Sequence, residues 1–190
     1  MWRQIAPAFR VTLFFTVLTG LIYPGVVTGL CQELFRWQAN GSLIKVSGQV
    51  VGSSLIGQNF TEPWDFHPRP SACNYDASDS AASNLGPVSR VLMDRVKAAV
   101  AKFRKDNPRY SGPIPADLLT TSASGLDPDI SVASAEAQAP RVAHARGASV
   151  RQVIALIHQK ATRRELGFLG EPEVNVLDLN LALDRKYPRR

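Results

Sequence analysis

The sequence predicts an α+β protein in which one N-terminal transmembrane helix precedes a single mixed domain outside the cytoplasm. Three observations predict this fold class. Residues 11–31 contain no Asp, Glu, Lys, Arg or His. The rest of the chain contains several stretches with apolar residues at helical spacing and one short pair of strand-like runs. Residues 32–190 are enough for one ordinary domain with its own core, built from a small hairpin and several helices.

The uncharged stretch Val11 to Cys31 has the length of a membrane span, since its 21 residues form a helix of roughly 30 Å. Pro24 removes one backbone donor from this helix, so we expect a kink there or a protein neighbour that covers the freed carbonyl. Gly20 and Gly25 allow another helix to approach closely. We therefore predict Gly20, Pro24 and Gly25 as contacts to a partner subunit.

The flanks of the span predict its orientation. Residues 1–10 carry Arg3 and Arg10 and no acidic residue, which favours a cytoplasmic tail. The stretch is longer than the apolar core of a signal peptide and no A-x-A-like cleavage site follows it. We therefore expect a cytoplasmic tail at 1–10, a transmembrane helix at 11–31 and an extracytoplasmic domain at 32–190, in a single-pass membrane protein.

The formal charge of +6 gives no nucleic-acid signal, because the excess of basic residues lies at the two ends of the chain. The terminal basic residues are Arg3, Arg10, Arg185, Lys186, Arg189 and Arg190. The near-neutral middle also has no acidic funnel that would gather cations. Two cysteines, Cys31 and Cys73, are too few for a disulfide framework, although one bridge between them stays possible.

The first part of the domain contains little regular structure. Residues 32–38 are typical of an interfacial segment, because Phe35 and Trp37 favour the headgroup region. Residues 43–51 predict a hairpin that turns at Ser47-Gly48. Residues 52–87 are rich in Gly, Ser, Asn, Asp and Pro, so we expect packed irregular structure there.

The second part of the domain is mainly helical. Ser89 is a candidate cap for a helix that ends near Lys105, and a short helix begins near Pro115. Residues 120–130 form a loop. Ahead of the last segment we expect three helices: one from Ser131 to Gln138, one from Pro140 to Gly147, and one that begins at the capping box Ser149–Gln152. The last segment predicts a short strand and then a helix from Val176.

The loop at 120–130 contains the residues that suggest catalysis. Ser122 or Ser124 beside Gly125 is a candidate nucleophile, with His144 and Asp127 as partners. A nucleophile elbow needs G-x-S-x-G after a strand, and this loop lacks both features. The alternative function, a membrane-anchored extracytoplasmic hydrolase, rests on these two serines. The bland interpretation is that the hydroxyls satisfy loop amides and cap helices.

Metal and nucleotide sites are not expected. The candidate metal ligands are Asp127, Asp129, His67, His144 and His158, but no pair of histidines has ligand spacing. The chain contains no G-x-x-x-x-G-K-[ST] phosphate loop. Arg141 and Arg146 share one predicted helix. Two interpretations are open: they lie on a face that is solvated or pairs with loops, or their guanidinium groups bind a partner through hydrogen bonds.

Five segments together resemble the C subunit of the Kdp-type potassium-transporting ATPase. They are WQANGSLI (37–44), GSSLIGQNF (52–60), TTSASGLDPDIS (120–131), QAPRVAHAR (138–146) and VNVLDLNLALD (174–184). With the N-terminal span, the resemblance covers nearly the whole chain. Further candidates for partner contact lie in two of these segments, namely Ser122, Ser124, Gly125, Asp127, Gln138 and Arg141.

The resemblance implies a non-catalytic accessory subunit of a four-part uptake complex. Its partners would be a potassium-channel-like A subunit, a P-type ATPase B subunit that hydrolyses ATP, and a small F subunit. Proteins similar to this one act as catalytic chaperones that raise the ATP affinity of the B subunit, so ATP is expected with that subunit and no cofactor on this chain alone. The family usually shows S-G-G-S-N-L where this chain has Ser80-Ala-Ala-Ser-Asn-Leu85, and loss of both glycines disfavours phosphate binding there.

Overall fold

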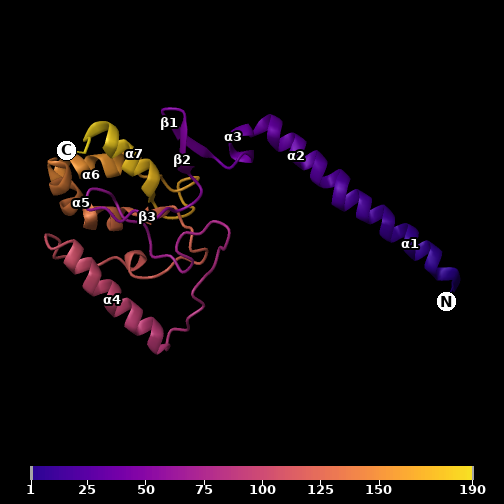
Figure 1. Cartoon of the computed structure of the whole chain (residues 1–190), viewed down its shortest axis with the longest axis horizontal. Coiled ribbons are helices and arrows are strands. Elements are labelled where there is room, and N and C mark those ends of the chain that lie inside the picture. The colour runs from indigo at the N-terminus through magenta and orange to yellow at the C-terminus, as the bar shows by residue number, and fades with distance from the viewer. Residues whose placement is uncertain (1, 190) are drawn as a thin grey trace. The chain divides into compact units, whose positions relative to one another are not determined.

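The computed structural model describes residues 2–189, which divide into two compact units at the boundary between Val51 and Gly52. The first unit is a long helix followed by a hairpin, and the second is a mixed domain of helices and short antiparallel strands (Figure 1). This architecture confirms the predicted α+β class with one apolar N-terminal helix.

The N-terminal helix runs from Trp2 to Leu34 in three consecutive parts, α1 (Trp2–Val17), a π-helical turn η1 (Leu18–Ile22) and α2 (Tyr23–Leu34). Within residues 2–189 it is the one helix long and apolar enough to cross a membrane. The helix therefore extends beyond the uncharged stretch 11–31 at both ends. None of its residues is buried by its own chain.

The π-helical turn accommodates Pro24. At the end of the turn the amide of Tyr23 donates to the carbonyl of Leu18, five residues back instead of four. Pro24 then stands in the first turn of α2, where a missing backbone N–H is tolerated. The sequence predicts a kink or a covering neighbour at Pro24, and the structure provides a widened turn just before it.

A short linker joins the long helix to the domain. It consists of α3 (Arg36–Ala39) and a hairpin of β1 (Leu43–Val46) and β2 (Gln49–Ser53). Ser47 and Gly48 have φ values of +52° and +83°, which is the sign pattern of a type I′ turn. The hairpin predicted at residues 43–51 is confirmed.

Three helices and two short strands enclose the core of the second unit. Strand β3 (Asp129–Ser131) pairs antiparallel with β4 (Glu173–Asn175), with Ile130 opposite Val174. Helices α5 (Val132–Arg146), α6 (Val150–Lys160) and α7 (Val176–Lys186) pack around this pair (Figure 1). The most buried large side chains of the core are Phe66, Ile130, Val142, Val153, Ile157, Val174, Val176, Leu179 and Leu183.

Side-chain caps define where the three helices begin. The Ser131 side chain accepts from the Ser134 amide, and Asn175 accepts from the Asp178 amide. Ser149 and Gln152 form the predicted capping box at the start of α6. Helix α5 ends at Gly147, whose φ of +65° is the left-handed conformation common at helix ends.

Two predictions about this region are wrong. The predicted helices Ser131–Gln138 and Pro140–Gly147 are one continuous helix, α5, with Pro140 in its interior. Six alanines in α5 give it strong helix propensity, and both its ends pack on the core, which outweighs one lost hydrogen bond. The sequence also predicts loop up to residue 130, where the structure has strand β3. Its pairing partner β4 lies more than 40 residues away, so no local pattern indicates this strand.

Helix α4 (Arg90–Asp106) is the least buried helix of the domain. Ser89 occupies the N-cap position as predicted, but its side chain makes no capping hydrogen bond. Phe103 is the buried residue of α4 and packs with Leu118, Ala137 and Tyr110 in a small second cluster. Leu118 belongs to η2 (Ala116–Leu118), the short helix predicted near Pro115. The helix is therefore attached through its C-terminal end.

Candidate functional site

The irregular segment 54–89 has no helix or strand, yet it supplies buried residues to the domain, among them Asp65 and Phe66. Phe66 is fully buried in the main core and Asp65 is 4% exposed. A buried backbone outside regular structure needs partners for its N–H and C=O groups. These partners are side chains of α5 and α7.

Two carboxamides hold consecutive residues of this segment. Asn180 of α7 accepts from the Phe66 amide at 2.8 Å and donates to the Phe66 carbonyl at 3.1 Å. Gln138 of α5 accepts from the His67 amide at 2.8 Å and donates to the His67 carbonyl at 3.1 Å. Each carboxamide therefore replaces the neighbouring strand that would otherwise pair with this backbone.

Arg141 of α5 holds the preceding part of the segment. Its Nη1 donates to the carbonyls of Glu62, Pro63 and Asp65 at 3.3, 2.6 and 2.9 Å. Its Nε donates to Asn107 Oδ1 at 3.0 Å and its Nη2 to Gln138 Oε1 at 2.8 Å. Burial lowers the pKa of Arg141 to about 10, so the side chain stays charged at neutral pH.

Arg146, at the C-terminal end of α5, forms the most buried ion pairs of the domain. Its side chain is 0% exposed and donates to Asp65 and to Asp184, each at 2.8 Å. It also donates to the carbonyls of Trp64 and Tyr187 at 2.6 and 3.0 Å. Although burial opposes ionisation of Asp184, hydrogen bonds from Arg189 and Arg146 lower its pKa. One guanidinium thus joins the irregular segment to α7 and the C-terminal residues.

A turn at residues 122–127 brings together four of the predicted contact residues. The buried Ser122 hydroxyl accepts from the Gly125 amide at 2.9 Å, and Ser124 Oγ accepts from the Leu126 amide at 3.1 Å. Gly125 has φ +71°, and a Cβ there would lie 2.6 Å from the Cys73 sulfur. Asp127 forms an ion pair with Arg69, with 2.8 Å between Asp127 Oδ2 and Arg69 Nη1.

The turn packs against the segment that contains Ser80–Leu85. Ser71 Oγ donates to the Gly125 carbonyl at 2.7 Å, and Ser80 Oγ donates to the Ser124 carbonyl at 2.9 Å. Thr121 Oγ1 donates to Ser83 Oγ at 3.3 Å. The serines of Ser80–Leu85 therefore bind the turn, and the structure gives this segment a packing role. Cys73 also lies here, and both Cys31 and Cys73 are free thiols.

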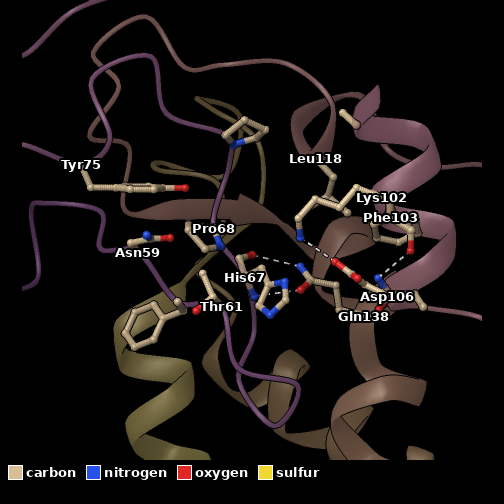
Figure 2. Close-up of a pocket in the computed structure, with 14 residues that line it drawn as sticks. Asn59, Thr61, His67, Pro68, Tyr75, Lys102, Phe103, Asp106, Leu118 and Gln138 are labelled. Atoms are coloured by element: carbon tan, nitrogen blue, oxygen red, sulfur yellow. Dashed lines mark hydrogen bonds and ion pairs between the residues drawn. The ribbon is translucent and has the colours of Figure 1, made fainter. Parts of the chain in front are cut away.

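A cavity of about 280 Å³ lies between α4 and the irregular segment (Figure 2). Its walls include Pro68 and Tyr75 on one side and Lys102 and Phe103 of α4 on the other. The His67 imidazole lies beside the Gln138 carboxamide in this cavity, and its Nε2 is 3.0 Å from the Glu62 carbonyl. Burial, followed by the charge of Arg141, lowers the pKa of His67 to about 4. His67 is therefore neutral at pH 7 and donates from Nε2.

The predicted nucleophiles and metal ligands do not form a catalytic group in the described residues. Within residues 2–189, no hydrogen bond joins the Ser122 or Ser124 hydroxyl to a histidine, and both hydroxyls close their own turn. No group of three His, Cys, Asp or Glu side chains in these residues has the geometry to hold a metal ion. His158 instead pairs with Glu136 at 3.0 Å on the surface.

The predicted partner contacts fall into three places. Gly20 and Gly25 lie on the N-terminal helix, where an added Cβ meets no atom of another described part of the chain within 4 Å. Ser122, Ser124, Gly125 and Asp127 form the turn described above. Gln138 and Arg141 contact each other and clamp the segment 62–67, which matches the loop-pairing interpretation of Arg141. The roles of Asn180 and Asp65 are not indicated by the sequence, because their partners Phe66 and Arg146 lie far along the chain.

The fold and site define a class: a protein with one N-terminal helix that is long and apolar enough to span a membrane, and a second unit that is a mixed domain held together by buried polar clamps. The family model of the K+-transporting ATPase c chain matches residues 5–185. A potassium-transporting ATPase KdpC subunit of Rhodospirillum rubrum is 51% identical over 190 residues, covering 99% of this chain and 98% of the relative. Those of Caulobacter vibrioides and Mycobacterium bovis are each 53% identical, covering 99% and 97% of this chain and 96% and 100% of the relatives. The chain belongs to the K+-transporting ATPase c chain (KdpC) family.

Replacement of Arg146 by methionine tests the buried clamp. Arg146→Met leaves Asp65 as a buried charge without its guanidinium, so we expect the free energy of unfolding to fall by about 3–5 kcal/mol. The measurement is urea unfolding of the detergent-solubilised chain, followed by tryptophan fluorescence. Lys102→Met is the control, because its pair with Asp106 is an exposed i,i+4 pair worth about 0.3–0.5 kcal/mol. Equal effects of the two substitutions would contradict the assigned role of Arg146.

The pKa of His67 predicts a loss of stability in acid. The folded state lowers this pKa from 6.5 to about 4, so the unfolded chain binds the proton more readily. The contribution of His67 is therefore complete above about pH 6.5 and is lost as the pH falls toward 4, by at most ~3 kcal/mol. His67→Gln should flatten this part of the stability profile, measured by unfolding at a series of pH values. His158→Gln, at an exposed histidine, should keep the wild-type drop in the free energy of unfolding between pH 6.5 and 4. An equal drop in the His67→Gln and His158→Gln variants would refute the assignment to His67.

Proposed function

We propose that this chain is a non-catalytic accessory subunit of a high-affinity, ATP-driven potassium uptake complex of the bacterial inner membrane. The observation that carries the proposal is the family match over residues 5–185, together with full-length relatives named as subunits of a potassium-transporting ATPase. In this proposal the partners are a channel-like A subunit, a P-type ATPase B subunit that hydrolyses ATP, and a small F subunit.

The use of the polar side chains supports an accessory role. Gln138, Arg141 and Arg146 all bind backbone or side-chain groups of the same domain. The serines of the 122–127 turn close that turn. A domain whose buried polar groups serve its own fold is suited to recognition by shape.

The membrane helix is the route by which this subunit acts on ATP in the proposal. With the N-terminus in the cytoplasm and the domain in the periplasm, the domain has no access to cytoplasmic ATP. An effect on the ATP affinity of the B subunit is then a coupling between distant sites. Small-residue positions on the helix, at Gly20 and Gly25, allow a neighbouring helix to approach closely, and the π-helical turn before Pro24 is a local irregularity of the kind found at functional sites.

Co-purification and ATPase kinetics test this function together. Tagged wild-type chain should retain the other subunits in detergent, and complex prepared without the chain should show a higher KM for ATP. Gly20→Leu and Gly25→Leu should reduce retention, because each adds a bulky side chain to a position that is open in the isolated chain. Pro24→Leu should act in the same direction if the turn shapes the interface.

Val26→Leu is the matched control for these helix variants, since it adds only one methylene to an exposed apolar position. It should retain the partners at the wild-type level. Recovery of the wild-type chain alone, with potassium uptake intact in a deletion strain, would refute the proposed function. Unchanged retention in both glycine variants would refute the helix contact while leaving complex membership in place.

Cysteine labelling tests the proposed orientation. Ala123 is exposed in the 122–127 turn, so Ala123→Cys in a Cys31→Ser, Cys73→Ser background offers one accessible thiol. A membrane-impermeant maleimide should label it in spheroplasts before lysis. Labelling only after lysis would place the domain in the cytoplasm and would make direct contact with ATP possible. A cysteine at Ala6, in the predicted cytoplasmic tail, is the opposite-side control.

A further inference from the structure

A tight turn between α6 and β4 projects apolar side chains from the domain. The Phe168 amide donates to the Glu165 carbonyl at 3.2 Å, and Glu165 and Leu169 exchange two backbone hydrogen bonds of 2.9 Å. The two residues at its tip, Leu166 and Gly167, have φ values of +52° and +83°. Both values are positive, as in a type I′ turn. We name residues 165–170 the apolar turn.

The side chains of the apolar turn are exposed although they are hydrophobic. Leu166 is 83% exposed, Phe168 69% and Leu169 47%. Three large apolar side chains within four consecutive residues are thus exposed, which differs from the scattered exposed residues normal on a surface. Within residues 2–189 no part of the chain buries them.

The residue at the tip is also unfavourable for its backbone conformation. The hairpin turn at Ser47-Gly48 has the same φ values, +52° and +83°, with a small polar residue in the first position. A type I′ turn favours Asn, Asp or Gly there, because a left-handed φ is disfavoured for a side chain such as leucine. Leu166 therefore has an unfavourable backbone conformation and buries little apolar surface, so it does not add to the stability of the isolated domain.

The base of the apolar turn is fixed to the core. Arg164 and Glu171 form a bidentate ion pair at 2.8 and 2.7 Å across the base. Thr162 then donates from its amide and its hydroxyl to the Glu173 carbonyl at 2.9 and 3.0 Å. Glu173 precedes the fully buried Val174 in β4. These contacts present Leu166 and Phe168 in a defined position before any partner arrives, which limits the entropy lost on binding.

The charges near the apolar turn distinguish a protein partner from a bilayer. Residues 163–173 contain three acidic residues, Glu165, Glu171 and Glu173, and two basic ones, Arg163 and Arg164, and Arg164 is paired with Glu171. Glu173 also lies close enough to Asp129 for their charges to interact. Insertion into an anionic headgroup layer favours clusters of Lys and Arg around the apolar side chains. The apolar turn has no such excess of basic residues: with Arg164 paired to Glu171, Arg163 is outnumbered by Glu165 and Glu173. This small acidic excess instead fits an apolar socket with basic residues at its rim.

We propose that the apolar turn is a docking knob, whose Leu166 and Phe168 side chains enter an apolar socket with a basic rim on another protein subunit of the potassium-transporting ATPase. This inference rests on the proposed function and assigns the partner contact to a part of the domain outside the 122–127 turn. The unfavourable leucine at the tip and its exposure then have one common cause, which is burial in the assembled complex.

The test exploits opposite effects of one substitution on stability and on assembly. Leu166→Asn creates Asn-Gly, the preferred pair for a type I′ turn, so the thermal unfolding midpoint of the solubilised chain should stay equal or rise. The same variant should lower the affinity for the other subunits roughly tenfold or more, because it removes a buried leucine. Phe168→Ser should also weaken retention. Val88→Asn, at a 90% exposed valine elsewhere in the domain, should change neither quantity.

Each outcome decides between the alternatives. If wild-type chain retains the subunits and Leu166→Asn retains them equally, the knob is refuted and the proposed function stands. If the wild-type chain retains none of the other subunits, both the knob and the proposed function are refuted. A lower unfolding midpoint for Leu166→Asn would also refute the inference, since the leucine would then stabilise the isolated domain. A fluorophore on Leu166→Cys, with both native cysteines changed to serine, should not be quenched by nitroxide lipid in vesicles that hold the chain alone; quenching would identify the bilayer as the occupant.

Discussion

The second unit depends on the guanidinium group of Arg146. It is fully buried at the end of α5, and it is the point where the irregular segment, α7 and the C-terminal residues meet. A buried ion pair is a weak source of net stability, because desolvation offsets most of its Coulomb energy. Its effect here is geometric. Because the buried Arg146 needs an acidic partner, Asp65 is held beside it, and this ion pair fixes where residues 62–67 lie.

The clamps of Arg141, Gln138 and Asn180 follow from the same constraint. Once Asp65 is fixed, Phe66 enters the core, and the polar backbone on either side of it needs partners. The carboxamides of Gln138 and Asn180 supply them as a strand would. The irregular segment is thereby ordered without regular structure, and it can form one wall of the cavity beside α4 and support the 122–127 turn through Arg69 and Ser71.

The sequence predicts those elements whose formation depends on residues close together in the chain. The hairpin at 43–51, the capping box of α6 and the strand-to-helix passage at Val176 are all present, since each depends on residues close together in the sequence. Strand β3 and the continuity of α5 through Pro140 depend on distant packing, so no window of the sequence indicates them. The candidate site shows the same division: the 122–127 turn follows from its own residues, whereas the pairing of Asp65 with Arg146 joins positions 81 residues apart.

Two features remain unexplained by the stability of the chain alone, and both are on surfaces that no other described residue covers. The N-terminal helix keeps glycines at 20 and 25, where larger residues would fit and would favour the helix. The apolar turn keeps Leu166 in a conformation that suits asparagine or glycine better. Sequences usually violate local preferences where function requires it. Membership of a multi-subunit transporter family supplies a common reason, since surfaces that are unfavourable in the free subunit become interfaces in the complex.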